Sequence, residues 1–397
     1  MLKDKTVVIG VTGSIAAYKI ATLVSMLKKQ NCQVHVILTK SGSEFITPLT
    51  FETLSGNKCY TDTFDRNFEF DVKHISIAKK ADLIMIAPAT ANIMAKLAYG
   101  LADDMLTTTV LASKAPKIIA PAMNTAMFEN PITQKNIDIL SKTGFDIIQP
   151  ETGLLACNDV GQGKMPEPEA LFEHIVRVLA RQKDLVGKNV LVTAGPTMES
   201  IDPVRYISNH STGKMGFAIA KECMLRGANV TLVTGQTREI PPMFVDVINV
   251  KSAEEMYQAV MEKSSMADFV FKAAAVADYT PRETHTNKVK KKDDDLAIEL
   301  TRTKDILMEL GSCKGSNQVI CGFSMETENL IENSMAKLKK KNADIIVANS
   351  LKEEGAGFGV DTNLVTIITK DGYVKKELMS KAMVAKLIVE SAMNIKK

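Results

Sequence analysis

Residues 207–216, Ile-Ser-Asn-His-Ser-Thr-Gly-Lys-Met-Gly, are the most informative segment for chemistry in this sequence. Small polar residues precede a helix predicted to begin near Gly213, shortly after the strand-like run 189–193. The N–H groups of such a segment and of a helix N-terminus bind anions, above all phosphate. The common phosphate-binding loop is excluded, because Ser208 replaces its glycine and Met215 replaces its Ser or Thr. The segment therefore predicts a more specialised phosphate site.

Two lysine-rich segments and one carboxylate in the second half support this prediction. Asp278 follows the small residues 273–277 at the end of a strand-like run, where a carboxylate can contact a nucleotide base. The lysine-rich segments are 288–291, in a polar arm, and 337–342, at the end of a helix-like run. A lysine run alone is usually a solvated face, and lysines near a helix C-terminus are stabilised there without a ligand. Together with the helix start near Gly213, these features favour a polyphosphate ligand.

Small and polar residues also follow three strand-like runs of the first half, in segments 10–15, 87–92 and 121–124. The carboxyl ends of parallel strands meet at one edge of a sheet, so these segments predict a site there for a flat or phosphorylated ligand. Ser14 can bind a phosphate oxygen or cap the following helix, and Asn124 can take part in this site or merely cap a helix. The G-x-G-x-x-G dinucleotide fingerprint is absent.

His74 and Cys157 offer acid–base and thiol chemistry in the first half. His74 lies in segment 72–76 at a predicted helix start, where a lone histidine is more often a surface or capping residue than a catalytic one. Cys157 lies in segment 153–165 among three glycines, which predicts a mobile loop able to close on a site. A buried, inert cysteine would more usually lie inside a strand or a helix.

The composition is that of an ordinary globular protein. The chain has 397 residues, 45% hydrophobic and 24% charged, and its length predicts about two to three domains. The net charge of +3 gives no reason to expect a nucleic acid or a membrane as a partner, and no apolar run approaches the ~20 residues of a membrane span. The N-terminus leads directly into a strand, unlike a signal peptide. The six scattered cysteines favour free thiols in a cytoplasmic protein over disulfides or a zinc site.

Strand-like and helix-like runs alternate throughout, which predicts two different doubly wound, Rossmann-like α/β domains. The polar stretch 181–188 separates them, so the predicted domains are 1–183 and 184–397. A second polar stretch, 280–296, is predicted to form a long loop or a hairpin arm. Predicted strands are 7–11, 34–38, 83–87, 117–120, 146–148, 190–193, 230–234, 246–250, 269–273, 319–322 and 345–348. Predicted helices are 15–29, 91–99, 105–113, 132–143, 168–181, 214–226, 253–263, 306–311, 328–341 and 380–394.

The first half resembles the flavin-dependent cysteine decarboxylases over about residues 1–180. The resemblance implies a flavodoxin-like flavoprotein domain that binds FMN and decarboxylates a C-terminal cysteine carboxylate. A cysteine carbanion has no stabilising group, so the flavin is needed as an electron sink that later returns the electrons. Asn158 stands where glycine is more familiar in this family. The matching residues are 13–15, His74, 87–92, 121–124 and the glycine-rich loop around Cys157.

This resemblance implies a role for each reactive residue of the first half. His74 would assist as a base in the oxidation step, Asn124 would hold the substrate carboxylate, and Cys157 would give a proton to the enethiolate. Some family members lack this cysteine and stop at the enethiol, so Cys157 favours the full reaction. The implied cofactor-binding residues are Gly13, Ser14, Ile15, Thr39, Ala87, Thr90 and Asn92.

Residues 186–397 closely resemble the phosphopantothenate–cysteine ligases, through segments 193–197, 202–206 and 207–216. The family activates the carboxylate of 4′-phosphopantothenate with CTP, which gives an acyl-cytidylate and pyrophosphate. The amine of cysteine then displaces CMP. Mg²⁺ is the expected metal, bridging triphosphate oxygens, and its protein ligands are unknown. The preference for CTP over ATP is implied by the resemblance alone.

The ligase resemblance also assigns residues. Asn209 would bind the acyl-cytidylate and take part in its formation or turnover, and Lys288 would stabilise negative charge as the carboxylate attacks the α-phosphorus. Thr303 and Lys304 stand where Asn-Pro is familiar. The implied nucleotide-binding residues are Ala273, Ala274, Ala275, Asp278, Lys288, Thr303, Lys304, Asp305, Ile306, Phe323, Lys337 and Lys341.

The two resemblances together indicate a bifunctional enzyme of bacterial coenzyme A biosynthesis. It would ligate cysteine to 4′-phosphopantothenate and then decarboxylate the product to 4′-phosphopantetheine. The resemblance implies a homo-oligomer, with trimers of the first half and dimers of the second. Two alternatives stay open: a nicotinamide dehydrogenase with two α/β domains, disfavoured by the missing fingerprint, and a flavoprotein that binds a partner protein without catalysis, disfavoured by His74, Asn124 and Cys157 together.

Overall fold

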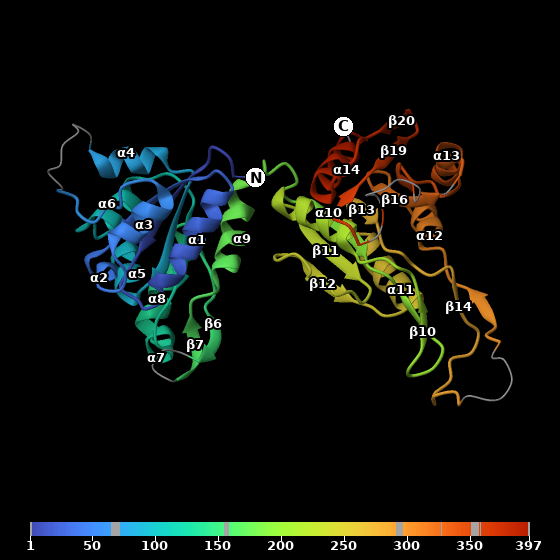
Figure 1. Cartoon of the computed structure of the whole chain (residues 1–397), viewed down its shortest axis with the longest axis horizontal. Helices are drawn as coiled ribbons and strands as arrows, with labels where there is room; N and C mark the ends of the chain where they lie inside the picture. Colours follow the sequence, from blue (N-terminus) through green and yellow to red (C-terminus); the bar gives the residue numbers. More distant parts are fainter. Residues whose placement is uncertain are drawn as a thin grey trace. The chain divides into compact units, whose positions relative to one another are not determined.

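The computed structural model describes residues 2–64, 72–154, 159–290, 297–326, 328–350, 357 and 359–395. The chain divides into two compact units, Met1–Gln182 and Lys183–Lys397, each with its own main sheet (Figure 1). The predicted α/β class is confirmed. Within the described ranges, no helix has the length and apolar character needed to span a membrane.

The first unit contains a five-stranded parallel sheet in the order β2-β1-β3-β4-β5. Its strands are apolar runs, and every residue of β3 is buried, as expected where helices cover both faces of a sheet. The strand order reverses between β1 and β3, and ligands of doubly wound sheets bind at the carboxyl ends of the strands beside such a reversal. The strands are β1 (Thr6–Val11), β2 (Gln33–Leu38), β3 (Leu83–Ala89), β4 (Lys117–Pro121) and β5 (Phe145–Ile147).

Helices cover both faces of this sheet (Figure 1). On one face α1 contacts α3 and α9. On the other, α4, α5, α6 and α8 bury an apolar cluster that includes Ile77, Ile93, Leu106 and Leu140. The helices are α1 (Ala17–Lys29), α2 (Lys40–Ser43), α3 (Pro48–Ser55), α4 (Lys73–Lys80), α5 (Ala91–Ala98), α6 (Met105–Ala112), α7 (Thr125–Glu129), α8 (Pro131–Lys142) and α9 (Pro168–Leu179).

The second unit contains an eight-stranded sheet in the order β12-β11-β8-β13-β16-β17-β19-β20. The first six strands in this order are parallel, whereas β19 and β20 add to the edge in antiparallel orientation. The order of the parallel strands reverses between β8 and β13, which predicts a second ligand-binding edge at their carboxyl ends. The strands are β8 (Asn189–Ala194), β11 (Asn229–Thr234), β12 (Asp246–Asn249), β13 (Phe269–Lys272), β16 (Val319–Glu326), β17 (Ile345–Ser350), β19 (Val365–Thr369) and β20 (Gly372–Lys375).

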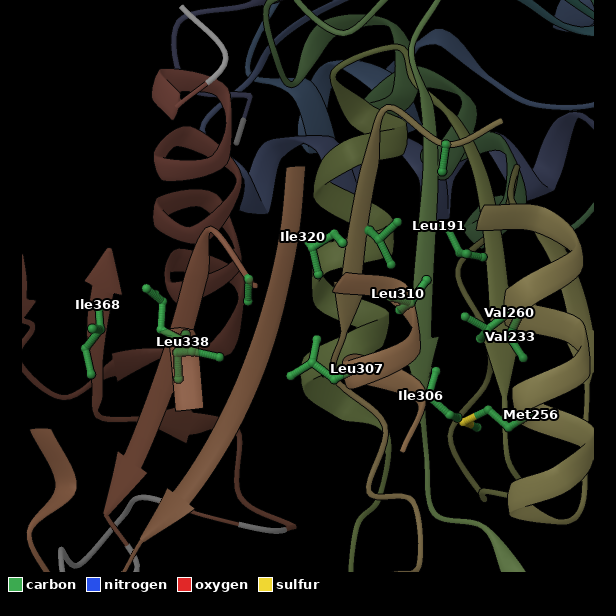
Figure 2. Close-up of a cluster of buried hydrophobic side chains, with 14 of the residues drawn as sticks. Leu191, Val233, Met256, Val260, Ile306, Leu307, Leu310, Ile320, Leu338 and Ile368 are labelled. Carbon is green, nitrogen blue, oxygen red and sulfur yellow. The ribbon is translucent and has the colours of Figure 1, made fainter. Parts of the chain in front are cut away.

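The main apolar core of this unit lies between the sheet and α11, α12 and α13. Figure 2 shows Met256 and Val260 of α11 on one side of this core, Leu310 of α12 in the middle, and Leu338 of α13 on the other side, near Ile368. On the opposite face α10 packs against α14 and β8. The helices are α10 (Lys214–Leu225), α11 (Ala253–Ser264), α12 (Ile306–Ser312), α13 (Leu330–Lys340) and α14 (Lys381–Ile395).

Short antiparallel strand pairs complete both units. The polar stretch 280–296 begins on β14, which pairs with β15, as expected for a hairpin arm, and its residues 291–296 lie outside the described residues. The prediction of a loop over 153–165 was wrong in extent, because its glycines lie on the strands β6 and β7. Residues 155–158, between these strands, lie outside the described residues. The pairs are β6 (Glu151–Leu154) with β7 (Val160–Lys164), β9 (Met198–Ser200) with β10 (Tyr206–Ser208), β14 (Tyr279–Pro281) with β15 (Leu300–Arg302), and β18 (Thr362–Asn363) with β21 (Met379–Ser380).

Candidate active sites at the carboxyl edges of the two sheets

Thr12 joins the two strands between which the order of the first sheet reverses. Its hydroxyl donates to the Pro88 carbonyl oxygen at 2.7 Å and accepts from the Thr90 backbone N–H at 3.2 Å. Thr12 is only 2% exposed, so these bonds are shielded from water and fix the segment after β1 against the segment after β3. Sequence reasoning missed Thr12, although a polar residue directly after a buried apolar strand was an available signal.

Three of the predicted cofactor-binding residues lie at helix starts on this edge. Thr39 caps α2 and Thr90 caps α5, each accepting from a backbone N–H, at 3.1 and 3.3 Å. Ser14 accepts from a backbone N–H just ahead of α1 at 3.3 Å. The turn before α1 packs directly on the start of α2, because a Cβ on Gly13 would lie 2.6 Å from the Cβ of Ser41. Several helix starts therefore meet at one edge, an arrangement that favours a phosphate anion.

A pocket of about 560 Å³ lies beside this edge, between the segments after β1 and β4 and the β6–β7 hairpin. Ser14, Ile15 and Asn124 all line it, so it brings together three predicted residues. The hairpin approaches closely because Gly163 has a φ of 145° and a Cβ there would lie 2.2 Å from the Met123 carbonyl oxygen. The Met123 N–H donates to the Gly163 carbonyl oxygen at 3.1 Å. The hairpin thus forms a wall of the pocket.

Asn124 caps α7, as one of the two alternatives drawn from the sequence expected, and it also lines the pocket. Its Oδ1 accepts from the Ala126 N–H of α7 at 2.9 Å, and its Nδ2 donates to Asp159 Oδ2 at 2.8 Å. An amide that already donates to one carboxylate has the geometry and chemistry to receive another.

Charged side chains on the wall of this pocket neutralise one another. Glu167 accepts from Lys19 at 2.8 Å and lies 3.2 Å from Lys164, which is also 3.8 Å from Glu151. The hydrogen bond from Lys19 holds the pKa of Glu167 below its ordinary value, and Glu167 in turn raises the pKa of Lys164. These groups form an ionised network that orients the wall of the pocket.

The other predicted residues of the first half that the structure describes do not line this pocket. His74 is the second residue of α4 and is half-buried. Ala87 is buried within β3, and Asn92 is exposed in the first turn of α5. Cys157 lies outside the described residues. The structure therefore gathers Ser14, Ile15 and Asn124 but not His74.

Two buried threonines join the strands at the reversal of the second sheet. Thr193 Oγ1 accepts from the Ala274 N–H at 3.1 Å, and Thr197 Oγ1 accepts from the Ala277 N–H at 3.0 Å. Neither threonine is exposed. Both lie in a segment that sequence analysis used for the ligase resemblance, but neither received a role. They hold the segment after β13, which carries the predicted nucleotide-binding residues.

Asn209 lies over this same segment. Its Nδ2 donates to the Ala275 carbonyl oxygen at 3.1 Å, while the Ser208 hydroxyl donates to the Thr197 carbonyl oxygen at 2.7 Å. Helix α10 begins beside it after Gly213, whose φ of 82° is in the left-handed region that favours glycine. The structure therefore brings Asn209, the start of α10 and the end of β13 together.

Lys214 is held by neighbours at the start of α10. Its ammonium donates to Asp361 at 2.7 Å and to the Gly359 carbonyl oxygen at 3.1 Å, and lies 3.7 Å from Glu239. The hydrogen bond to Asp361 raises the pKa of Lys214. This lysine anchors the segment before β18 to α10, in keeping with a site that differs from the common phosphate-binding loop.

A second pocket, of about 550 Å³, lies where β13, β16, α12 and α13 meet. It gathers nine of the twelve predicted nucleotide-binding residues, and Lys288, Ala273 and Ala275 are the three that do not line it. Their clustering depends on the sheet order, since β13 and β16 are adjacent although far apart in sequence. The nine residues are Ala274, Asp278, Thr303, Lys304, Asp305, Ile306, Phe323, Lys337 and Lys341.

Three lysines of this pocket each have a defined partner. Lys337 donates to the Phe323 carbonyl oxygen at 2.8 Å, Lys341 pairs with Asp305, and Lys304 donates to Glu254 at 2.8 Å. Burial lowers the pKa of Lys337. Burial alone would raise the pKa of Asp305, but the hydrogen bonds from Lys341 and from the Met308 N–H, together with nearby positive charge, outweigh it and hold that pKa below its ordinary value. The pocket is thus ionised and ordered, with cationic and anionic groups side by side.

Lys288 lies on the arm between β14 and β15 and is exposed. The residue after it, Val289, donates its N–H to Asp202 at 3.2 Å and accepts from Arg205 at 3.1 Å. The Arg205 guanidinium holds the pKa of the Asp202 carboxyl well below its usual range. Asp202 and Arg205, which sequence analysis noted without a role, therefore anchor the backbone beside Lys288.

Two family models together match nearly the whole chain. The model described as DNA/pantothenate metabolism flavoprotein C-terminal domain matches residues 185–395, and the model described as Flavoprotein matches residues 1–180.

Curated relatives resemble the chain along most of its length. The coenzyme A biosynthesis bifunctional protein CoaBC of Bacillus subtilis is 46% identical over 95% of this chain and 93% of its own length. The protein of the same name from Haemophilus influenzae is 44% identical over 97% of this chain and 96% of its own length. A cysteine/cysteine sulfinic acid decarboxylase from an unknown prokaryotic organism is 44% identical over 88% of this chain and 99% of its own. A crystal structure of the C-terminal domain of a CoaBC protein is 43% identical and covers 53% of this chain and 97% of that one, with a TM-score of 0.46.

Proposed function

The chain belongs to the family of bifunctional coenzyme A biosynthesis proteins, and from this premise we propose that it catalyses two consecutive steps. The first is CTP-dependent ligation of L-cysteine to 4′-phosphopantothenate. The second is FMN-dependent decarboxylation of the product to 4′-phosphopantetheine. The observation that carries the proposal is the gathering of nine predicted nucleotide-binding residues in one pocket of the second unit. The dehydrogenase and the non-catalytic flavoprotein are not retained, because neither agrees with this family membership.

The ligase step is assigned to the second unit, residues 184–397. A carboxylate oxygen of 4′-phosphopantothenate attacks the α-phosphorus of CTP, and pyrophosphate leaves. The cysteine amine then attacks the acyl carbon, and CMP leaves as the amide forms. Asn209, held beside Ala275, would bind the acyl-cytidylate, and Lys288 on its anchored arm would stabilise the charge that develops at the α-phosphorus. Mg²⁺ would bind together with the nucleotide and offset the negative charge of its phosphates.

The decarboxylase step is assigned to the first unit, residues 1–183. The carboxyl edge beside β1 and β3 fits the FMN phosphate, since the hydroxyl-bearing helix starts of Ser14, Thr39 and Thr90 meet there. The flavin, when bound, supplies the electron sink that loss of carbon dioxide from a cysteine carboxylate requires. Asn124 Nδ2 would bind the substrate carboxylate in place of Asp159. Cys157 would supply a proton at its Sγ to the product side chain.

His74 would serve as the base of this step from a second copy of the chain. Support comes from the pocket beside Ser14 and Asn124, whose lining does not include His74. We therefore propose a homo-oligomer in which the decarboxylase sites form between copies, with trimeric contacts in the first unit and dimeric contacts in the second. The proposed compartment is the cytosol, where thiols such as the buried Cys32 and Cys223 remain reduced.

Comparison of nucleotides tests the ligase proposal. Purified protein is supplied with 4′-phosphopantothenate, cysteine and Mg²⁺, together with either CTP or ATP, and pyrophosphate is measured. The proposal expects release with CTP that requires the pantothenate compound. Release that needs no pantothenate compound, or that occurs with ATP alone, would contradict it. For the flavin, the purified protein should be yellow and absorb near ~450 nm, and a colourless protein that does not take up FMN would contradict the decarboxylase assignment.

A further inference from the structure

Lys272 lines the second pocket but is not among the twelve implied nucleotide-binding residues. It is the last residue of β13 and lies in register between Thr193 of β8 and Gly322 of β16. It is two residues beyond Val270, which belongs to the apolar core under α12, so its side chain leaves the same face of the strand. It lines the pocket together with Phe323. A lysine thus stands where an apolar core ends and a polar pocket begins.

Lys272 differs from the other lysines of this pocket in its partners. Lys304, Lys337 and Lys341 each donate to a carboxylate or a carbonyl oxygen. Among the residues that the structure describes, the Lys272 ammonium has no hydrogen-bond or ion-pair partner. A partly buried ammonium without a partner is costly, and a ligand with an acceptor atom would relieve that cost. Its three N–H donors are available to such a ligand.

Charges of both signs surround Lys272. Lys337 and Lys341 face it from α13 and its end, Asp305 from the start of α12, and Asp278 from the segment after β13. Arg302, Lys304 and Tyr279 complete the charged and titratable lining of the pocket. Burial, followed by repulsion from Lys337, lowers the pKa of Lys272 to about 8. Its charge therefore changes within an accessible range of pH.

We propose that the protonated Lys272 donates a hydrogen bond to an acceptor oxygen of the cytidine nucleotide bound in this pocket, so that nucleotide binding is coupled to proton uptake by this residue. This inference rests on the proposed CTP-dependent ligase. A base carbonyl and a phosphate oxygen share the required chemistry. The nucleotide would bind the charged form of Lys272. The affinity for the nucleotide should therefore be highest below the pKa that Lys272 has in the nucleotide-free protein, and should fall as the pH rises through that pKa.

The test measures the Kd of the full chain for CTP and for CMP by calorimetry between pH 7 and pH 9.5, for wild type, Lys272→Met, Lys272→Arg and the control Lys263→Met. Lys263 lies at the end of α11 and pairs with Glu262. The Lys263→Met variant therefore loses the same charge as Lys272→Met, but at a position that does not line the pocket. We expect Lys272→Met to weaken CTP binding about 10-fold to 100-fold at pH 7 and to abolish the loss of affinity above pH 8. Lys272→Arg should bind without that pH dependence, because a guanidinium stays charged. Lys263→Met should match wild type.

The outcomes separate this inference from the ligase proposal. If Lys272→Met weakens the binding of CTP and CMP equally, the acceptor oxygen lies on the part that both nucleotides share. If only CTP binding is weakened, the acceptor lies on the β- or γ-phosphate. Unchanged affinity and pH profile in Lys272→Met overturn the inference while the ligase stands. Failure of wild type to bind either nucleotide overturns the ligase proposal itself. If Lys272→Met does not fold, the binding enthalpy of the wild-type protein is measured in two buffers of different ionisation enthalpy, which gives the number of protons taken up on CTP binding. If no proton is taken up near pH 8, the inference is overturned.

Discussion

The two units use the same sheet-edge principle but assemble their sites differently. In the second unit one pocket gathers most of the predicted nucleotide-binding residues from β13, β16, α12 and α13. In the first unit the pocket gathers Ser14, Ile15 and Asn124, whereas His74 on α4 does not line it. A reversal of strand order thus fixes where a site lies, but only the loops and helices around it decide whether one copy of the chain completes that site.

Loss of Lys288 would separate the two activities most clearly. Lys288→Ala should lower ligation about 100-fold or more, because it removes charge stabilisation at the reacting phosphorus. Decarboxylation of added 4′-phosphopantothenoylcysteine should be unchanged. Pyrophosphate and carbon dioxide release measure the two steps, and Lys290→Ala, an exposed lysine on the same arm, is the control. Equal loss of both activities would contradict separate sites.

Mixing two inactive variants tests whether the first site needs a second copy. Asn124→Ala and His74→Ala should each lower decarboxylation about 100-fold, while ligation stays intact. Co-expressed variants should recover activity, because mixed oligomers contain some sites with both wild-type residues. No recovery despite mixed oligomers would indicate that both residues act from one copy.

Gly163→Ala tests the wall that the β6–β7 hairpin gives to the first pocket. The added Cβ would lie 2.2 Å from the Met123 carbonyl oxygen, so the hairpin must move and decarboxylation should fall roughly 10-fold, with a loss of stability of about 1–3 kcal/mol. Gly153→Ala on the facing strand is the matched control, because its nearest neighbour would be the Lys164 side chain at 3.5 Å. Activity and thermal unfolding measure both effects. If the two variants behave alike, close approach at Gly163 is unimportant.

Asp159→Ala is expected to have the smallest effect. Asp159 accepts from Asn124 at 2.8 Å, so removing its carboxylate removes a group that competes with the substrate carboxylate for this amide and should lower KM for the decarboxylase substrate about 3-fold to 10-fold. Steady-state kinetics on added 4′-phosphopantothenoylcysteine measures it, with ligation as the internal control. A raised KM would show that Asp159 helps to bind the substrate.

Sequence periodicity predicted the central strands and most helices, because buried parallel strands are continuous apolar runs. It did not predict the β6–β7 hairpin over the glycine-rich segment. The hairpin packs through Gly163 against Met123, forty residues earlier, and no local pattern reports such a contact. Short edge pairs of this kind rest on long-range packing more than on propensity.

The site residues named from the sequence are those that a family resemblance implied. Residues that matter through their contacts with distant parts of the chain were not identified from the sequence. Thr12, Thr193 and Thr197 join strands whose adjacency follows from the sheet order, which a single strand does not reveal. Lys272 looked like the end of an apolar strand, and only the placement of β16 and α13 puts it in the nucleotide pocket. Local sequence thus indicated the edges, while topology selected the residues that meet there.

The most direct test of two consecutive activities in one chain uses cysteine labelled at its carboxyl carbon. Wild-type protein receives this cysteine with 4′-phosphopantothenate, CTP and Mg²⁺, and pyrophosphate and labelled carbon dioxide are followed together. Pyrophosphate should appear first, labelled carbon dioxide should follow in equal amount, and release of both should require every substrate. Labelled carbon dioxide from cysteine alone, without CTP or the pantothenate compound, would contradict this prediction.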